Sequence, residues 1–323
     1  MPDTFICAYA LNGDGSGTCL TEEALRSAGA EGKPTWVHLS ARSASARKWL
    51  AHDADLPDST LVDALLAEDT RPRMLPRESG LLLILRGVNL NENAEPEDMV
   101  SIRIWIEAHR FISVQLRNLR GVAEMQELLQ SGTGPVDIND LMTTLIEGSI
   151  KRLAPVMGDL AEGIDELEDQ ILHMQLTGVR EKVISIRRQT SVFNRFLGPQ
   201  KDTVGRLNET DALRLNPKLK RRLQEAHNDM TRFVEDLQTI RERAHSIQNE
   251  VANILTERLN RNTYVFSIIA SIFLPLSFLT GLLGINVLGI PGADDPRAFL
   301  IFCGILVAIM ATQILLFRKL RWF

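Results

Sequence analysis

Two uncharged apolar runs near the C-terminal end of the chain constrain its fold more than any other feature. They cover residues 264–283 and 298–317, and each is 20 residues long. About 20 apolar residues in an α-helix cross the ~30 Å hydrocarbon core of a bilayer, so both runs are predicted to be transmembrane helices. Two helices cannot enclose an aqueous path. The runs are therefore either a plain anchor or one subunit's share of a pore that several copies build.

Charged residues at the edges of these runs predict how the chain lies across the membrane. The loop between the runs carries Asp294, Asp295 and a single basic residue, Arg297. The basic residues that precede the first run or follow the second are Arg258, Arg261, Arg318, Lys319 and Arg321. Because basic residues stay on the cytoplasmic side, both termini are expected inside the cell and the loop outside.

The composition of the rest of the chain excludes several classes of function. A formal net charge of -5 and the lack of a long basic run argue against nucleic acid as a partner. The three cysteines form no CxxC motif, which fits a reducing cytoplasm. The sequence contains neither a nucleophile elbow nor a phosphate-binding loop, so we expect no enzyme and no cofactor.

Strand-like and helix-like patterns alternate over residues 1–135, which is typical of an α/β layer domain. Thr21 followed by two acidic residues predicts the start of a helix. Strands are expected at 5–11, 36–39, 80–88, 99–106 and 111–116, and further helices near 43–52 and 59–67.

From about residue 136 the pattern becomes helical throughout. Apolar residues recur at spacings of 3 and 4 over 145–171 and again over 183–197, where Gly198-Pro199 is expected to end the helix. Asn216-Pro217 predicts the start of a third helix, and no glycine or proline follows until Pro275. That helix is therefore expected to run some 65 residues, straight into the membrane.

The predicted fold class is thus an α+β membrane protein with three parts. Residues 1–135 form the α/β domain and residues 136–262 form a stalk of long helices. Residues 263–323 form the transmembrane domain, with spans at about 263–283 and 298–317, a loop at 284–297 and a basic tail at 318–323.

A stripe of small and polar residues follows the helical repeat into the first span. Its members are Asn260, Thr263, Ser267, Ala270, Leu274, Ser277 and Gly281, and the same spacing continues to Gly284. Small residues let helices pack closely, so the stripe is one candidate for a packing seam. The alternative is that it lines a water-filled axis, which Asn260 and the serines favour. Leu274, its bulky member, would then form an apolar constriction that gates by dewetting.

Gly284-Ile285-Asn286 lies at the outer end of the stripe. A ring of uncharged amides can hydrogen-bond the water shell of a cation through its carbonyl oxygens without binding the ion too tightly. Gly-x-Asn is also an ordinary turn. Asp294 and Asp295, repeated in several copies, would attract cations to the mouth, or they are simply solvated loop acids partly offset by Arg297.

Candidate metal ligands lie outside the spans, which contain no Asp, Glu or His. Asp169 and His173 are four residues apart on a predicted helix, and Glu242 and His245 are three apart on another. Each pair is either a metal site or a set of solvated side chains. An ion in the membrane is expected to keep much of its hydration.

The order of these parts resembles the CorA superfamily of metal-ion transporters. The resemblance is sharpest over residues 274–287, which end in Gly284-Ile285-Asn286-Val287, and over Gly289-Ile290-Pro291-Gly292. CorA itself has Met at the position of Ile285 and an acidic loop after it, so the chain looks like the zinc-transporting ZntB branch. Leu288 departs from that branch, whose loop has a glycine there.

The resemblance implies a homopentamer in the bacterial inner membrane, with five first spans around the pore and a cytoplasmic funnel of long helices. It implies inward movement of Zn²⁺ together with protons. A CorA-like channel for Mg²⁺ or Co²⁺ is the alternative, and a membrane-tethered scaffold without transport is a third possibility.

Overall fold

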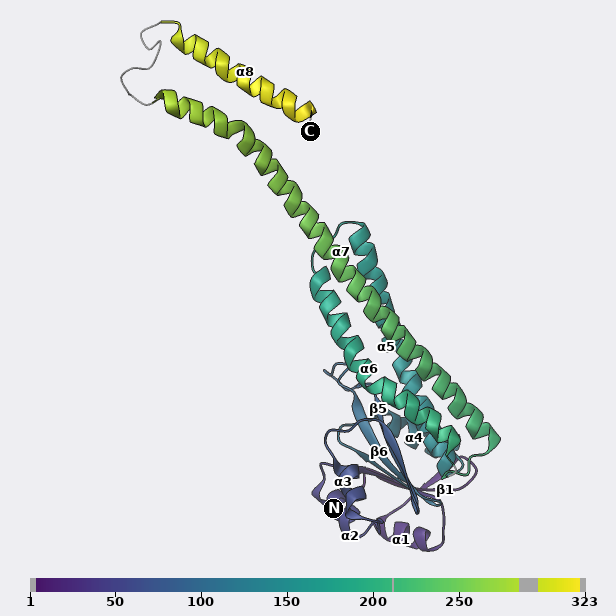
Figure 1. The fold of residues 1–323 in the computed structure, drawn as a ribbon. Coiled ribbons are helices and arrows are strands. Elements are labelled where there is room, and N and C mark those ends of the chain that lie inside the picture. The colour runs from purple at the N-terminus through teal and green to yellow at the C-terminus, as the bar shows by residue number, and fades with distance from the viewer. Residues whose placement is uncertain (1–3, 211, 285–295, 320–323) are drawn as a thin grey trace. The chain divides into compact units, whose positions relative to one another are not determined.

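The computed structural model describes residues 4–210, 212–284 and 296–319. The chain divides into two compact units, Met1–Gln248 and Asn249–Phe323. We call the first the polar unit and the second the membrane unit (Figure 1). Helix α7 (Pro217–Gly284) contributes residues to both. The expected domain limits at residues 135 and 262 stay predictions.

A seven-stranded mixed sheet forms the centre of the polar unit. Its strand order is β2-β1-β3-β7-β6-β5-β4. Neighbouring strands are antiparallel except for β3 and β7, which run parallel. The strands are β1 (Cys7–Leu11), β2 (Gly17–Cys19), β3 (Thr35–Ser40), β4 (Arg73–Arg77), β5 (Gly80–Gly87), β6 (Val100–Ile106) and β7 (Arg110–Gln115).

Helices cover both faces of this sheet. Helices α1 (Glu22–Ala30), α2 (Ala44–His52) and α3 (Ser59–Leu66) pack on the face to which Val37 and Leu39 point. Helix α4 (Arg120–Ser131) lies on the other face, where Gln130 Nε2 donates a hydrogen bond of 3.1 Å to Tyr9 Oη. The expected cap of α1 is confirmed, because Thr21 Oγ1 accepts the N–H of Ala24 at 3.3 Å. Strand β4 and helix α4 lacked a sequence prediction.

Three long helices, α5 (Ile138–Leu172), α6 (Val179–Glu209) and the first part of α7, complete the polar unit. Their buried apolar residues recur at spacings of 3 and 4, as in Leu160, Ile164 and Leu167 of α5. The predicted start of α7 is confirmed, because Asn216 Oδ1 accepts the N–H of Leu219 at 2.9 Å. At 68 residues α7 is a single helix, as the absence of glycine and proline before Pro275 predicts, and it continues through Pro275 to Gly284.

The prediction that Gly198-Pro199 ends a helix is wrong, because α6 continues to Glu209. An interior proline costs about 3 kcal/mol, and contacts beyond it offset that cost. Buried Gln200 accepts the N–H of Arg86 at 2.6 Å and donates to the Arg86 carbonyl at 3.0 Å, so the helix is fastened to β5. Val204 and Leu207 are fully buried further along. Tertiary packing outweighs the local helix-breaking signal.

The membrane unit consists of the rest of α7 and of α8 (Ala298–Lys319). Both helices are long and apolar enough to cross a bilayer. The predicted class, an α/β layer domain followed by long helices and two apolar C-terminal helices, is therefore confirmed.

Candidate ion path and the contacts that position it

Within residues 264–284 of α7, the least exposed side chains mark the side that α8 covers. Ile268 is 7% exposed. The half-buried members of this set are Ile272, Pro275, Leu276 and Leu279. Helix α8 reaches the same segment through Gln313, whose Nε2 donates to the Ser271 carbonyl at 3.3 Å. Together these residues define the α8-facing side of the first span.

The polar stripe lies on the opposite side of the helix. Each residue advances about 100° around an α-helix axis. On that spacing, the mean direction of the positions from Thr263 to Gly281 differs by roughly 180° from that of the α8-facing set. The stripe is therefore not the seam between the two helices of one chain. It forms the surface of the first span that faces away from α8.

The hydroxyl groups along this part of α7 bond to their own helix. Ser267 Oγ donates to the Thr263 carbonyl at 2.8 Å, and Ser271 Oγ donates to the Ser267 carbonyl at 2.7 Å. A hydroxyl that gives its hydrogen to the backbone keeps its oxygen lone pairs as acceptors. Ser267 thus offers the stripe a hydrogen-bond acceptor, which suits the water shell of a cation.

The structure places the described members of the stripe as one continuous helical row. Asn260, Thr263, Ser267, Ala270, Leu274, Ser277 and Gly281 are all exposed in the chain. Leu274 is 70% exposed and interrupts the small residues midway. A Cβ on Gly281 or Gly284 would meet no atom within 4 Å. Ile285, Asn286, Asp294 and Asp295 lie outside the described residues.

The two candidate metal pairs lie on helix surfaces of the polar unit. His173 caps the C-terminal end of α5, and its Nδ1 lies 2.9 Å from the Asp169 carbonyl oxygen and 3.4 Å from Asp169 Oδ1. Glu242 accepts a hydrogen bond from Gln238, and both Glu242 and His245 are in helix α7. Within the described residues, no group of three or more His, Cys, Asp or Glu side chains converges on a common point. The Asp169–His173 contact is also that of an ordinary helix end.

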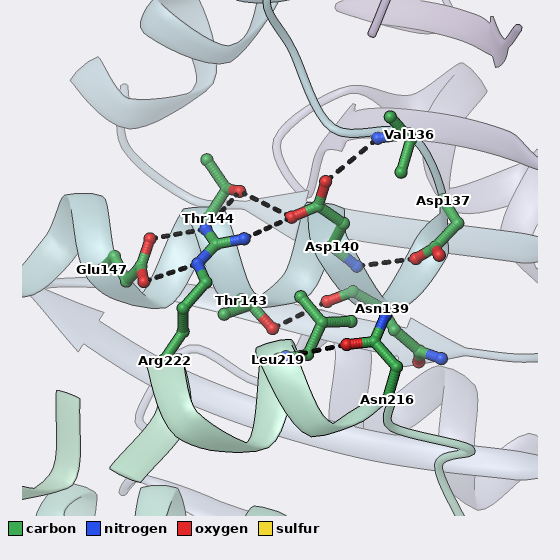
Figure 2. Close-up of polar contacts among 10 residues, drawn as sticks. All are labelled: Val136, Asp137, Asn139, Asp140, Thr143, Thr144, Glu147, Asn216, Leu219 and Arg222. Atoms are coloured by element: carbon green, nitrogen blue, oxygen red, sulfur yellow. Dashed lines mark hydrogen bonds and ion pairs between the residues drawn. The ribbon is translucent and has the colours of Figure 1, made fainter. Parts of the chain in front are cut away.

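An arginine near the start of α7 fastens this helix to α5 (Figure 2). Arg222 binds the Glu147 carboxylate with two nitrogens, at 2.8 and 2.6 Å, and Asp140 with a third at 2.5 Å. Its Nη2 also donates to Thr144 Oγ1 at 3.1 Å. The three charged side chains are about three-quarters buried or more. Hydrogen bonding to Glu147 raises the pKa of Arg222 further above its usual value.

A second arginine repeats this arrangement further along α7. Arg243 binds Glu168 through two nitrogens, at 2.8 and 2.7 Å, and Asp165 at 2.6 Å. Hydrogen bonds to Glu168 and then to Asp165 raise the pKa of Arg243, and the bond from Arg243 lowers the pKa of Glu168. Part of the acidic run on α5 is therefore neutralised within the chain. The long helix is held to α5 at two points, Arg222 and Arg243.

Sequence reasoning did not identify these two arginines or Gln313. Gln313 carries a recognisable signal, because it is a lone amide in an otherwise apolar run. The acidic partners of the arginines are 75 to 82 residues away in the chain. No local pattern links them.

Comparison with known proteins shows the family. The model of the CorA family, described as CorA-like Mg²⁺ transporter protein, matches residues 31–319. A divalent cation transporter CmaX of Pseudomonas aeruginosa is 36% identical over 98% of this chain and 96% of its own. A zinc transport protein ZntB of Pectobacterium atrosepticum is 33% identical over 98% of this chain and 95% of its own.

Solved structures agree with these sequence relatives. The full-length CmaX protein has a TM-score of 0.84 over 98% of both chains, at 36% identity. The ZntB cytoplasmic domain from Vibrio parahaemolyticus has a TM-score of 0.68 over 78% of this chain and 98% of its own, at 27% identity. CorA from Methanocaldococcus jannaschii, at 19% identity, shares the fold with a TM-score of 0.80.

The family that these comparisons identify is a class of membrane transporters. The chain belongs to the CorA-like family of metal-ion transporters, and its relatives include proteins named ZntB and CmaX. The resemblance seen in the sequence is therefore confirmed. The family is one of transporters and not of enzymes.

Proposed function

We propose that this protein carries divalent cations across a membrane through a path walled by the polar stripes of several copies. The observation that carries the proposal is the position of the stripe on the side of α7 opposite α8. The described residues of one chain contain two candidate spans, and two helices cannot enclose water. Copies arranged with α8 outside and the stripe inside would enclose a narrow, hydrated axis.

The chemistry of the stripe supports passage of a hydrated ion. Its polar groups are hydroxyls and an amide, and the spans contain no carboxylate or imidazole. Such oxygens hydrogen-bond the water around a cation but do not strip that water away. Leu274 provides the apolar constriction at which a dry and a wet state can alternate. Gly284, Ile285 and Asn286 would form the outer ring, with Asp294 and Asp295 drawing cations to it.

Zn²⁺ with protons is the proposed cargo, and a pentamer in the bacterial inner membrane is the proposed assembly. The name of the ZntB relatives supports zinc, and the name of the CmaX relative supports a divalent cation more broadly. Because the spans contain no Asp, Glu or His, a coupled proton must be handled outside them. We further propose that two pairs of side chains in the polar unit bind the transported metal: Asp169 with His173, and Glu242 with His245. The positions of basic residues support cytoplasmic termini.

A channel for Mg²⁺ or Co²⁺ is the second candidate, favoured by one observation. Zinc sites use Cys, His or carboxylate ligands, and the stripe has none of them. A path that passes hydrated ions does not by itself prefer zinc. The family description, CorA-like Mg²⁺ transporter protein, points the same way.

Flux into proteoliposomes tests the proposal. The purified chain is reconstituted with a metal-sensitive dye inside, and Zn²⁺, Mg²⁺ and Co²⁺ are added at buffered free concentrations, with and without a pH gradient. We expect metal influx at a rate that Asn286→Ala changes. We also expect an inward proton gradient to accelerate the influx of Zn²⁺. Mg²⁺ influx indifferent to the gradient would favour the second candidate. No flux of any metal, with Asn286→Ala indistinguishable from the parent, would leave a tether without transport.

A further inference from the structure

Pro275 interrupts the backbone hydrogen bonds of α7 inside the first span. In an α-helix each backbone N–H donates to the carbonyl four residues earlier, and proline has no N–H. The Ser271 carbonyl therefore lacks its helical donor, although α7 continues through Pro275 to Gly284. The proline ring also crowds this carbonyl, which bends a helix at such a position. The first span thus contains a weak point with a free hydrogen-bond acceptor.

Helix α8 supplies the donor that Pro275 lacks. Gln313 Nε2 donates to the Ser271 carbonyl at 3.3 Å, across the contact between the two helices. An amide side chain in hydrocarbon is costly unless it finds a partner. The other atom of the amide, Oε1, is buried and has no hydrogen-bond partner among the residues that the structure describes. The bond to Ser271 is therefore the polar contact that joins this side chain to α7.

Two prolines inside helices of the polar unit have different surroundings. Pro155 of α5 and Pro199 of α6 free the carbonyls of Lys151 and Arg195 in the same way. Lys151 and Arg195 are exposed residues, and water can donate to a backbone carbonyl that is exposed. Hydrocarbon contains no such donor. A carbonyl freed within a span needs a donor from the protein, and Gln313 provides it.

The weak point lies beside the bulky member of the polar stripe. Leu274 immediately precedes Pro275 and is 70% exposed, on the side of α7 that faces away from α8. Ser277 and Gly281, the last described positions of the row before Gly284, follow the proline. The bend at Pro275 therefore determines how Leu274 and the later part of the row are placed relative to the earlier part.

We propose that Gln313 is a positioning residue for the ion path. By donating to the Ser271 carbonyl, it holds the bend at Pro275 and so fixes the place of Leu274 in the row. This inference rests on the proposed function only in assigning the row to an ion path. Without the donor, an unsatisfied carbonyl remains in hydrocarbon and the bend is no longer held at one angle. Copies that bend differently cannot bring Leu274 to a common constriction.

Pulsed electron paramagnetic resonance across the bend tests the proposal without relying on flux. In a chain without its three native cysteines, spin labels replace the exposed residues Phe266 and Leu282. In a straight helix these positions are about 24 Å apart. Labelled chain is diluted with unlabelled chain in lipid nanodiscs, so that label pairs within one chain dominate. Gln313→Met keeps the side-chain length but cannot donate, and it should widen the distance distribution about twofold. Equal widths in this variant and the parent would overturn the proposal.

Pro275→Ala separates the role of the carbonyl from that of packing. The introduced alanine has an N–H that donates to the Ser271 carbonyl, so the amide of α8 is no longer needed. Adding Gln313→Met to Pro275→Ala should therefore leave the distance distribution unchanged. Equal widening with and without Pro275→Ala would show that Gln313 acts through packing alone, and would contradict the proposal.

Thr312→Val is the matched control on α8. The Thr312 hydroxyl donates to the Ala308 carbonyl of its own helix at 2.8 Å. Its loss removes a polar group next to Gln313 without touching the Ser271 carbonyl, so the distance distribution should match that of the parent. Widening as large as that of Gln313→Met would contradict a specific role for the amide.

Gln313→Glu adds a readout that a loss of packing would not give. A protonated carboxyl group can donate to a carbonyl, and an ionised one cannot. We therefore expect the parent's narrow distribution at pH 5 and a wide one at pH 9, with little dependence on pH in the parent and in Gln313→Met. A distribution at pH 5 as wide as that of Gln313→Met would contradict the role of a donor.

Flux into proteoliposomes connects the bend to the ion path. Gln313→Met should reduce metal influx about tenfold, the order expected when a buried carbonyl loses its donor. Undiminished influx in this variant would contradict the positioning role. Lack of influx with the parent itself would contradict the proposed function instead, and the distance measurement would still decide whether Gln313 holds the bend.

Discussion

The long helices of the polar unit and of the membrane unit distribute their apolar and polar side chains in opposite ways. In the polar unit, apolar residues of α5, α6 and α7 are buried against one another, and the acidic residues Asp140, Glu147, Asp165 and Glu168 are paired with Arg222 or Arg243. In the membrane unit, large apolar side chains such as Phe266 and Phe278 are 71% and 66% exposed. There, the polar groups of the spans are few, uncharged and confined mainly to one row or to the contact with α8.

This difference shows that the surroundings of one helix can change along its length, from a water-soluble bundle to a membrane span. Up to about residue 248, α7 follows the rule of a water-soluble bundle, in which apolar side chains point inwards. From about residue 264 on, most apolar side chains are exposed, and small and polar residues form a separate row. The reversal within a single helix supports the proposal that the row faces other copies around water.

Filling the row should have the largest effect. Ala270→Leu adds a bulky side chain to every copy at one level of the proposed axis, so we expect near-complete loss of cation flux in proteoliposomes. Ile269→Leu is the matched control, because it changes the neighbouring position with no change in volume and should retain flux. Equal flux in Ala270→Leu and the parent would show that position 270 does not line the ion path.

Truncating a large apolar side chain should lower stability much more in the polar unit than in the membrane unit. Trp105 is fully buried in the polar unit, and Trp105→Ala should lower the free energy of unfolding by about 3–5 kcal/mol. Phe266→Ala removes a side chain of the membrane unit that is 71% exposed, and we expect little change in the same measurement. Denaturant unfolding of the full chain in detergent, followed by circular dichroism, checks both. Comparable losses would contradict the division into an inward-packed and an outward-facing unit.

The polar unit should also respond to acid in a way that the uncharged spans cannot. Burial lowers the pKa of His38 from 6.5 to about 4. Between pH 6.5 and about 4, the unfolded chain therefore binds a proton at His38 and the folded chain does not. As a result, the free energy of unfolding falls as the pH drops through this range. For a group this deeply buried the loss is on the order of 3 kcal/mol.

His38→Gln isolates that contribution. Its unfolding free energy should vary less between pH 6.5 and 4 than that of the parent, because no imidazole remains to be protonated. Denaturant titrations at several pH values measure the difference. An identical pH dependence in both chains would show that His38 has the same pKa in the folded and the unfolded chain.

The arginine contacts of α7 should give the smallest effect. Arg222→Ala leaves Glu147 and Asp140 partly buried without their cation, and we expect a loss of about 2 kcal/mol. Arg221→Ala, one residue earlier, removes an arginine whose side chain is 84% exposed, and should cost well below 1 kcal/mol. Unfolding in detergent compares the two. Similar losses would mean that the network in Figure 2 adds no more than a surface pair does.

Local patterns predicted much of this fold. Thr21 and Asn216 cap helices as expected, because an N-cap depends on residues within one turn. The prediction that Gly198-Pro199 ends a helix was wrong, because the contacts of Gln200 with Arg86 join residues 114 positions apart. The two arginine clamps on α7 were not predicted for the same reason.

The candidate site was predicted in part. The row from Thr263 to Gly281 follows from helical spacing alone, but its relation to α8 requires a second helix in place, through Ile268 and Gln313. Gly284 ends α7, and its role with Ile285 and Asn286 stays a prediction.

Thiol labelling of single cysteines along the first span tests most directly whether the row faces water. After replacement of Cys7, Cys19 and Cys303, cysteines are placed at Ser267 and Ser277 in the row and at Ile268 and Leu279 on the α8-facing side. In proteoliposomes, a membrane-impermeant thiol reagent should modify the first two rapidly and reduce flux. Faster modification at positions 268 and 279, or equal rates at all four, would contradict a shared aqueous axis.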